Sequence, residues 1–70
     1  MHTVEEILGH VNNPTETDKE LISRAYEFAA KAHEGHKRYS GDPYMVHTAA
    51  VGYKLAEMGM GPRTISAGLL

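Results

Sequence analysis

The chain contains no cysteine and no tryptophan among its 70 residues, and aromatic residues make up only 7% of it. Without cysteine no disulfide can hold a small fold together, and no thiolate can bind a metal or attack a substrate. A chain of this size buries roughly 60% of its unfolded surface, so its core has to be small. The composition therefore predicts one marginal domain without cross-links, which fits a reducing compartment.

Long apolar runs and excess positive charge are also missing. No stretch approaches the roughly 20 apolar residues that span a bilayer, and the N-terminal MHTVEEILGHVNN is too polar and acidic for a signal peptide. Net charge is −2 with neutral histidines, whereas nucleic-acid-binding domains are usually basic. We therefore expect a cytoplasmic protein with no membrane partner, and the charge argues against a nucleic-acid partner.

Helical spacing of apolar residues predicts an all-α fold, with two helices in the first half of the chain. A short amphipathic helix is expected over residues 3–10, before Pro14. In the run Thr17-Asp18-Lys19-Glu20, the hydroxyl of Thr17 can accept from the backbone N–H of Glu20, as in a capping box. This predicts a long helix over 18–34, with an apolar face of Leu21, Ile22, Ala25, Phe28, Ala29 and Ala32.

A central helix is expected after the turn Ser40-Gly41-Asp42-Pro43. Asp42 followed by Pro43 is typical of an N-cap and a first helical residue, so the helix should run from about Pro43 to Met58 and end at Gly59. Two apolar sides suggest contacts from several directions. One side has Val46, Ala50, Tyr53 and Ala56 or Glu57, and the other has Val51, Leu55 and Met58.

Pro62 opens a last helix, in which Ile65 and Leu69 are four residues apart. We expect several large apolar side chains to stay partly in water, at a loss of roughly 1.5–3 kcal/mol each. These are Ile65, Leu69, Leu70, Val51 and Leu55. The sequence thus predicts a homodimer or higher oligomer, whose interface includes the last and central helices.

Ligand-like side chains gather in HEGHKRYSGDPYMVH, which runs from His33 to His47 and holds three of the five histidines. His47 is either a core histidine or a metal ligand, because neutral imidazole is the commonest protein metal ligand. His33 and His36 are spaced for zinc chelation, but Gly35 lies between them and is a plausible helix stop. Lys37 and Arg38 belong either to a solvated loop or to an anion- or base-binding site.

The segment AYEFAAKAHEGHKRYSGDPYMVHTAAVGYKLAEMG resembles the start of the hydrolase domain of the RelA/SpoT-type family, which degrades (p)ppGpp. The family pattern A-x-x-F-A-x-x-A-H-x-G-Q-x-R-x-S-G-x-P-Y-x-x-H-P is matched at Ala25, Phe28, Ala29, Ala32, His33, Gly35, Arg38, Ser40, Gly41, Pro43, Tyr44 and His47. The later TISAGLL resembles the family's T-I-x-A-A-L-L, so the resemblance covers about residues 18–70.

The resemblance implies the N-terminal four-helix portion of an HD-type helical domain. In that family a histidine, an adjacent His-Asp pair and a distant aspartate hold a manganese ion, and His47 matches the first histidine. It also implies that Arg38 and Ser40 lie against the guanine end of guanosine tetra- or pentaphosphate, with Lys37 and Tyr39 beside them. The family reaction hydrolyses the 3′-pyrophosphate, and metal activates water in such hydrolyses.

Departures from the family pattern limit what these residues can do alone. The family continues L-L-H-D-x-x-E-D, whereas this chain stops at Leu70. His36 replaces a glutamine, Thr48 replaces a proline, and Tyr39 stands where a basic residue is common. We expect a partial domain over 1–70 that binds manganese weakly or not at all and is inactive alone.

Two other functions stay open. The run AEMGMGPRTISAGLL also resembles a helix-turn-helix, in which Arg63, Thr64 and Ser66 would read DNA bases. The third possibility is a non-catalytic interaction module derived from the hydrolase domain, which would bind a partner through exposed helices. Salt-dependent DNA binding would favour the helix-turn-helix. Capture of a partner protein without nucleotide or metal would favour the interaction module.

Overall fold

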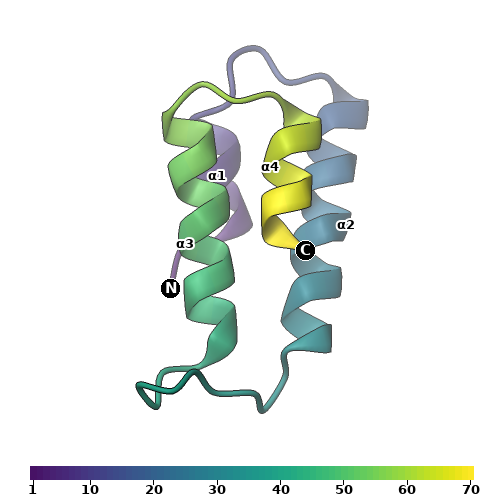
Figure 1. Ribbon diagram of the computed structural model, residues 1–70. Coiled ribbons are helices and arrows are strands. Elements are labelled where there is room, and N and C mark those ends of the chain that lie inside the picture. The colour runs from purple at the N-terminus through teal and green to yellow at the C-terminus, as the bar shows by residue number, and fades with distance from the viewer.

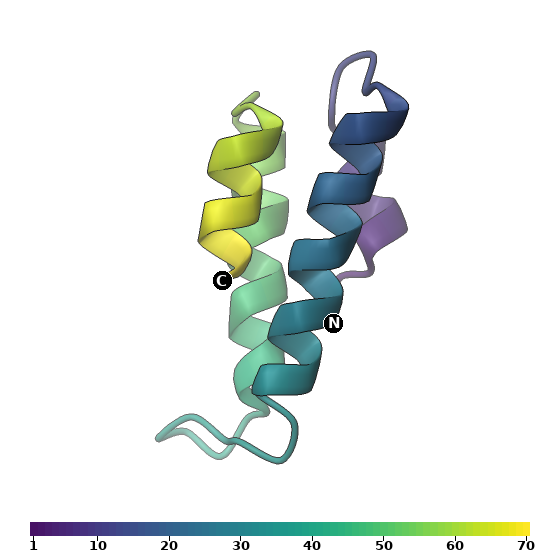
Figure 2. The same ribbon diagram turned by 90° about the vertical axis from the view of Figure 1, so that its right-hand side faces the viewer.

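The computed structural model describes all 70 residues and contains four helices, α1 (Val4–Gly9), α2 (Glu16–Ala32), α3 (Tyr44–Glu57) and α4 (Pro62–Leu69). The long helices α2 and α3 are joined at the lower end by a loop, and α4 folds back along their upper halves (Figures 1 and 2). The only bridge between extended residues joins Lys37 and Pro43. The predicted all-α fold is confirmed, and each helix is too short or too polar to span a bilayer.

The helix α1 begins with a capping box and is held to the rest of the chain by aromatic side chains. The Thr3 hydroxyl accepts from the backbone N–H of Glu6 at 3.2 Å, and the Glu6 carboxylate accepts from the backbone N–H of Thr3 at 3.0 Å. The backbone N–H of Thr3, with a smaller contribution from His2, holds the pKa of Glu6 below its usual range. The Tyr26 hydroxyl donates to the carbonyl of His2 at 2.6 Å. The bond from Tyr26 thus ties the N-terminal segment to α2.

We expect acidification to weaken this cap. Because the pKa of Glu6 is lower in the folded chain, its contribution to stability is complete above about pH 4.3 and is lost as the pH falls through the folded pKa. Glu6→Gln can still accept from Thr3 but does not titrate. Its thermal midpoint, followed by circular dichroism from about pH 7 to pH 3, should therefore fall less than that of the wild type.

The matched control for this measurement is Glu27→Gln, which removes an exposed glutamate of α2 that caps no helix. Glu27→Gln should follow the wild-type pH profile. Equal losses of stability for wild type and Glu6→Gln would show that the carboxylate of Glu6 contributes nothing.

The helix α2 begins two residues earlier than predicted. Thr15, not Thr17, is its N-cap, and its hydroxyl accepts from the backbone N–H of Asp18 at 3.0 Å. The Asp18 carboxylate accepts in return from the backbone N–H of Thr15 at 3.0 Å. The sequence offers two overlapping boxes, and the earlier one gains half a turn of helix while Glu20 stays free to pair with Arg24. The helix ends at Ala32, since Gly35 takes the left-handed conformation (φ 78°).

The predicted apolar face of α2 is only partly buried. Ile22, Ala25 and Ala29 are buried, whereas Leu21 is 41% and Phe28 67% exposed, and Ala32 is also exposed. The predicted face was therefore too wide, because the short α4 covers only part of it (Figure 2).

The two apolar sides predicted for α3 are confirmed only in part, since Ala56 is buried and Tyr53 and Leu55 pack against the core, whereas Met58 is exposed. Val46 and Ala50 are exposed, and the buried residues are mostly small: Met45, Thr48, Ala49, Gly52 and Ala56. The reason is close approach of the neighbouring helices. A Cβ on Gly52 would stand 2.5 Å from Cδ2 of Leu69 and 3.4 Å from Cδ1 of Ile7. A prediction based on hydrophobicity alone gives too little weight to a helix face made of small residues.

The start of α3 also differs from the prediction. Pro43, not Asp42, occupies the N-cap position, and no side chain caps the helix. The backbone N–H of Tyr44 instead donates to the carbonyl of His36 at 2.9 Å. The free N–H at this helix start is thus satisfied by the preceding loop, which ties the loop to α3.

The turn into α4 follows the prediction, but the burial of α4 does not. Gly59 is left-handed (φ 79°) and Pro62 is the first helical residue. Ile65 and Leu69, which were expected to be partly in water, are both 0% exposed in a core with Ile7, Ile22, Ala25 and Ala56. Leu70 is exposed as expected, and Val51 and Leu55 are half-buried. The four helices therefore enclose a small core within one chain.

The same burial contradicts part of the helix-turn-helix hypothesis. Arg63 and Thr64 are exposed, but Ser66 is 6% exposed and faces the interior, so it cannot reach a base edge. In both ribbon views α4 runs back alongside α3 (Figures 1 and 2), whereas the two helices of a helix-turn-helix cross at about 90–120°.

Candidate functional site

The loop between α2 and α3 is a small hairpin held by its own backbone. The N–H of Arg38 donates to the carbonyl of Asp42 at 2.8 Å, and the N–H of Gly41 donates to the carbonyl of Arg38 at 2.8 Å. Gly41 takes a left-handed conformation (φ 91°), which glycine adopts without strain. The tight turn thus spans Arg38 to Gly41, two residues before the turn predicted at Ser40 to Pro43. Because these bonds use only backbone groups, the side chains of the loop remain free to contact a ligand.

All four predicted substrate-binding residues lie in this hairpin and are exposed. Lys37 and Arg38 form no ion pair in the structure, and Tyr39 is fully exposed at the tip (111%). The Ser40 hydroxyl donates to the Asp42 carboxylate at 3.2 Å, so its oxygen can still accept a hydrogen bond. The hairpin therefore offers two cations, one aromatic ring and one hydroxyl to solvent on a short, hydrogen-bonded support.

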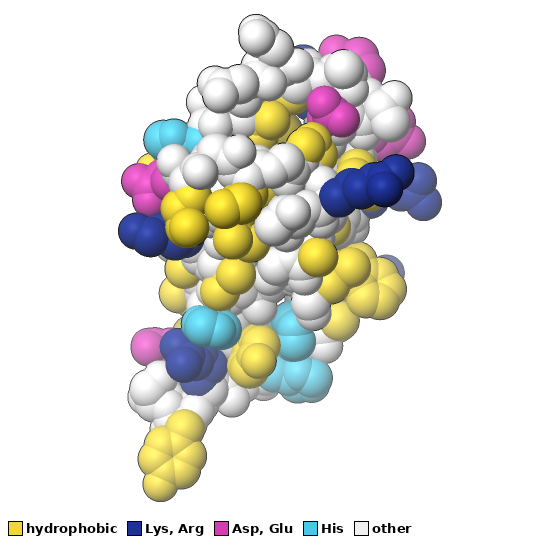
Figure 3. Space-filling view, turned by 45° about the horizontal axis from the view of Figure 1, so that its top comes forward, with side chains coloured by type: hydrophobic (Ala, Val, Ile, Leu, Met, Phe, Trp, Pro, Cys, Tyr) yellow, Lys and Arg dark blue, Asp and Glu magenta, His cyan; other side chains and the backbone are white.

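A row of four rings runs from the hairpin to His47. Ring centroids are 6.0 Å apart for His36 and His33, 4.5 Å for His33 and Tyr44, and 5.9 Å for Tyr44 and His47. His33 is the C-cap of α2, whereas Tyr44 and His47 lie in the first turn of α3. On the face shown in Figure 3, most of the visible histidine side chains lie in the lower half of the molecule, with one group of cationic atoms beside them. The contact between Tyr44 and His47 follows from their i,i+3 spacing on α3, whereas the contact between His33 and Tyr44 joins two helices and is not revealed by residue spacing.

The predicted residues do not share one cavity. A hollow of about 470 Å³ is lined by residues of the loop and both long helices, including His33, His36 and Lys37. A second hollow of about 320 Å³ is lined by His47, Ala50, Val51, Lys54 and Leu55. His47 is half-buried there, beside a lysine and apolar side chains. The hairpin and the predicted metal ligand are thus neighbours on the surface, with separate hollows.

The residues present do not fit a manganese site. No group of three or more histidine, aspartate or glutamate side chains lies close enough to hold an ion. Lys54 lines the hollow of His47, and an ammonium group there repels a cation. Manganese also prefers oxygen ligands. His33 and His36 likewise gain no third ligand, so neither predicted histidine position forms a complete centre within these 70 residues.

A second cluster of titratable groups lies between the N-terminal segment and α3, and it was not predicted from the sequence. The ring of His2 stacks on Tyr53 with centroids 3.8 Å apart, and His10 Nε2 lies 3.0 Å from the Tyr53 hydroxyl. His2 Nδ1 lies 3.6 Å from the Glu6 carboxylate. The spacing of His2, Glu6 and His10, four residues apart, could have signalled a common face. These contacts anchor the N-terminal segment and α1 to α3, and this structural role accounts for the cluster.

Comparison with known proteins finds relatives along most of the chain. The chain is 45% identical over 67 residues to the guanosine-3′,5′-bis(diphosphate) 3′-pyrophosphohydrolase of Aquifex aeolicus. The matched stretch covers 96% of this chain and 9% of that protein. It is 57% identical over 49 residues to a GTP pyrophosphokinase of Streptomyces coelicolor, covering 70% of this chain and 6% of that protein.

A third relative is the bifunctional (p)ppGpp synthase/hydrolase RelA of Mycobacterium tuberculosis, 47% identical over 53 residues, or 76% of this chain and 7% of that protein. The chain thus spans less than a tenth of the length of these relatives. No family model and no solved structure matches it.

Proposed function

Because this chain belongs over most of its length to the RelA/SpoT-type family, we propose that it forms part of the nucleotide pocket of a (p)ppGpp 3′-pyrophosphohydrolase. The observation that carries the proposal is the 45% identity over 67 residues to a protein named for that activity. That stretch spans 96% of the chain. The proposal concerns a wall of the pocket, not a complete enzyme.

The chemistry of the hairpin suits this role. Guanosine tetraphosphate is strongly anionic, and Lys37 and Arg38 are exposed cations on a support that is already ordered by backbone bonds. A guanidinium can stack on a guanine face or grip phosphate oxygens in a fork. The hydroxyl of Ser40 keeps an accepting lone pair for a base N–H. We assign Arg38 and Ser40 to the base, with Lys37 and Tyr39 at the rim.

We also propose His47 as one ligand of the family's metal ion. Since these 70 residues offer no complete set of ligands, the remaining ligands of such a site would be side chains that are not among them. We derive no step through the metal. The expected behaviour of the chain by itself is nucleotide binding without turnover.

Nuclear magnetic resonance titration with guanosine tetraphosphate tests the proposal. We expect the amide signals of residues 33–47 to shift, and Arg38→Ala to weaken binding by about tenfold, because a charge-assisted contact is lost. The matched control is Arg63→Ala, which removes an exposed arginine from the first turn of α4. The helix α4 begins at the end of the molecule opposite the loop between α2 and α3 (Figure 1).

Two outcomes would contradict the assignment. One is a set of shifts that avoids the hairpin, and the other is an equal loss of affinity in Arg38→Ala and Arg63→Ala. Release of pyrophosphate during the titration, abolished by His47→Ala, would contradict the expectation that the chain does not turn over.

A further inference from the structure

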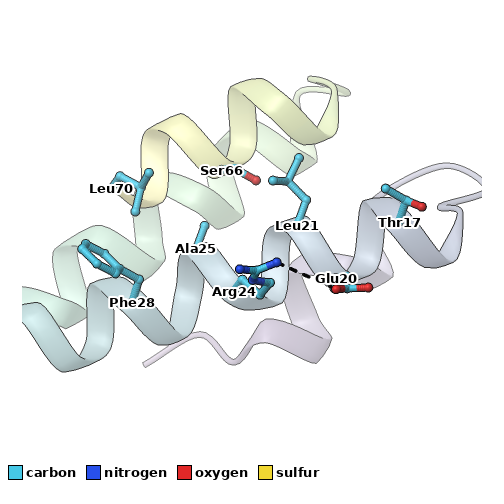
Figure 4. Close-up of a pocket in the computed structure, with 8 residues that line it drawn as sticks. All are labelled: Thr17, Glu20, Leu21, Arg24, Ala25, Phe28, Ser66 and Leu70. Carbon is cyan, nitrogen blue, oxygen red and sulfur yellow. Dashed lines mark ion pairs between the residues drawn. The ribbon is translucent and has the colours of Figure 1, made fainter.

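A groove of about 610 Å³ runs between α2 and α4 (Figure 4). Leu21, Ala25, Phe28 and Leu70 supply its apolar lining. Thr17, Glu20 and Arg24 form its polar rim, and Glu20 and Arg24 pair at 3.9 Å. Neither the core nor the proposed nucleotide pocket accounts for this groove.

Three large apolar side chains of the groove stand in water. Phe28 and Leu70 are each 67% exposed and Leu21 is 41% exposed. They lie along one side of the molecule, on α2 and at the end of α4 (Figure 4). Singly exposed apolar residues are ordinary, but a contiguous set beside a hollow marks an interaction surface.

A buried hydroxyl adds to this picture. Ser66 Oγ is the one buried side-chain polar atom in the structure that lacks a hydrogen-bond partner. It lies between α4 and α2 and points toward Leu21 (Figure 4). Buried hydroxyls normally have a hydrogen-bond partner, and Ser66 is an exception on the wall of the groove.

The charges of α2 indicate what covers the groove. Residues 16–20 carry three carboxylates and one ammonium, a net charge of −2 (Glu16, Asp18, Lys19 and Glu20). Residues 24–31 carry two cations and one carboxylate, a net charge of +1 (Arg24, Glu27 and Lys31). Two copies of α2 side by side attract one another when antiparallel and repel when parallel.

We propose that the groove is the interface of a homodimer, in which α2 of a second copy lies antiparallel against it. A two-fold axis makes such a contact self-complementary, since each copy offers the same projecting side chain and the same hollow. Phe28 of each copy enters the groove of the other. This places the predicted oligomer contact on α2 and α4, and leaves α3 and the hairpin outside it.

Sedimentation equilibrium of the 70-residue chain over a range of concentrations tests the dimer. The wild type should approach twice 7.7 kDa, and Phe28→Glu should raise the dissociation constant by at least about tenfold, because a large apolar side chain no longer leaves water. Phe28 is mostly exposed in the single chain, so its variant should keep the wild-type circular dichroism spectrum.

Met58→Glu is the matched control, because Met58 is an apolar residue of similar exposure (58%) that does not line the groove. It should dimerise as the wild type does. A wild-type chain that stays near 7.7 kDa at every concentration overturns the proposal. A loss in Met58→Glu as large as that in Phe28→Glu also overturns it, since association would then involve another surface.

Spin labelling decides the orientation. Because the chain has no cysteine, Glu16→Cys provides a single site for a nitroxide, and labelled chains can be mixed with unlabelled, nitrogen-15-enriched chains. In an antiparallel dimer the label broadens amide signals near Lys31 of the enriched copy. Broadening centred on residues 16–20 of the enriched copy would mean a parallel contact and would contradict the proposal.

Discussion

Replacing Leu69 with alanine is expected to leave most of the chain unfolded at about 25 °C. Leu69 is fully buried, and its side chain packs against the surface that Gly52 leaves open on α3. A buried leucine-to-alanine change costs about 2–5 kcal/mol, because transfer energy is lost and a cavity remains. A domain of this size has a stability of about 3–5 kcal/mol. The change therefore removes most or all of the free energy of unfolding.

The neighbouring residue supplies the control for this experiment. Leu70→Ala deletes the same atoms from a side chain that is 67% exposed, so its effect should stay below about 0.5 kcal/mol. Urea unfolding followed by circular dichroism, in dilute solution where the single chain prevails, measures both variants. Similar losses for Leu69→Ala and Leu70→Ala would show that α4 does not close the core in the way described.

Gly52→Val is expected to lower the thermal midpoint by about 5–20 °C, through a loss of about 1–3 kcal/mol. The physical reason is overpacking, since the first atom of a side chain would already stand 2.5 Å from Leu69 Cδ2. Leu69 and Ile7 are both fully buried in the core, so moving them aside would disturb its packing. The closeness of α1, α3 and α4 at this point makes glycine necessary.

Gly9→Val is the matched control, because a Cβ on Gly9 has no heavy atom within 4 Å. Gly9 is the last residue of α1, and its replacement should leave the midpoint within a few degrees of the wild type. A calorimetric scan gives both values. An unchanged midpoint in Gly52→Val would mean that the helices can separate there at little cost, contrary to the packing described.

Much of the fold could be predicted from local sequence signals. The four helices, the stop at Gly59 and the start at Pro62 follow from backbone preferences that neighbouring elements do not alter. The start of α2 could not be decided, since Thr15 and Thr17 both head plausible capping boxes. The buried face of α3 was missed because small residues such as Ala49 and Gly52 gain importance only from what packs on them.

The candidate site was also predictable only in part, because some of its features are local and others depend on packing between helices. The identity and exposure of the loop residues Lys37 and Arg38 follow from the sequence. The shift of the turn and the ring contact between His33 and Tyr44 depend on how α2 and α3 meet. The α2–α4 groove was hidden because Phe28 has the helical spacing of a core residue.

The positions of the two chain ends have a practical consequence for purification tags. Met1 lines the hollow that also contains His33, His36 and Lys37, and the bond from Tyr26 to the carbonyl of His2 keeps it there. Leu70 lines the groove between α2 and α4. A peptide fused to the N-terminus would therefore obstruct the proposed nucleotide-binding side and leave the proposed dimer interface free. A peptide fused to the C-terminus would obstruct the dimer interface and leave the nucleotide-binding side free.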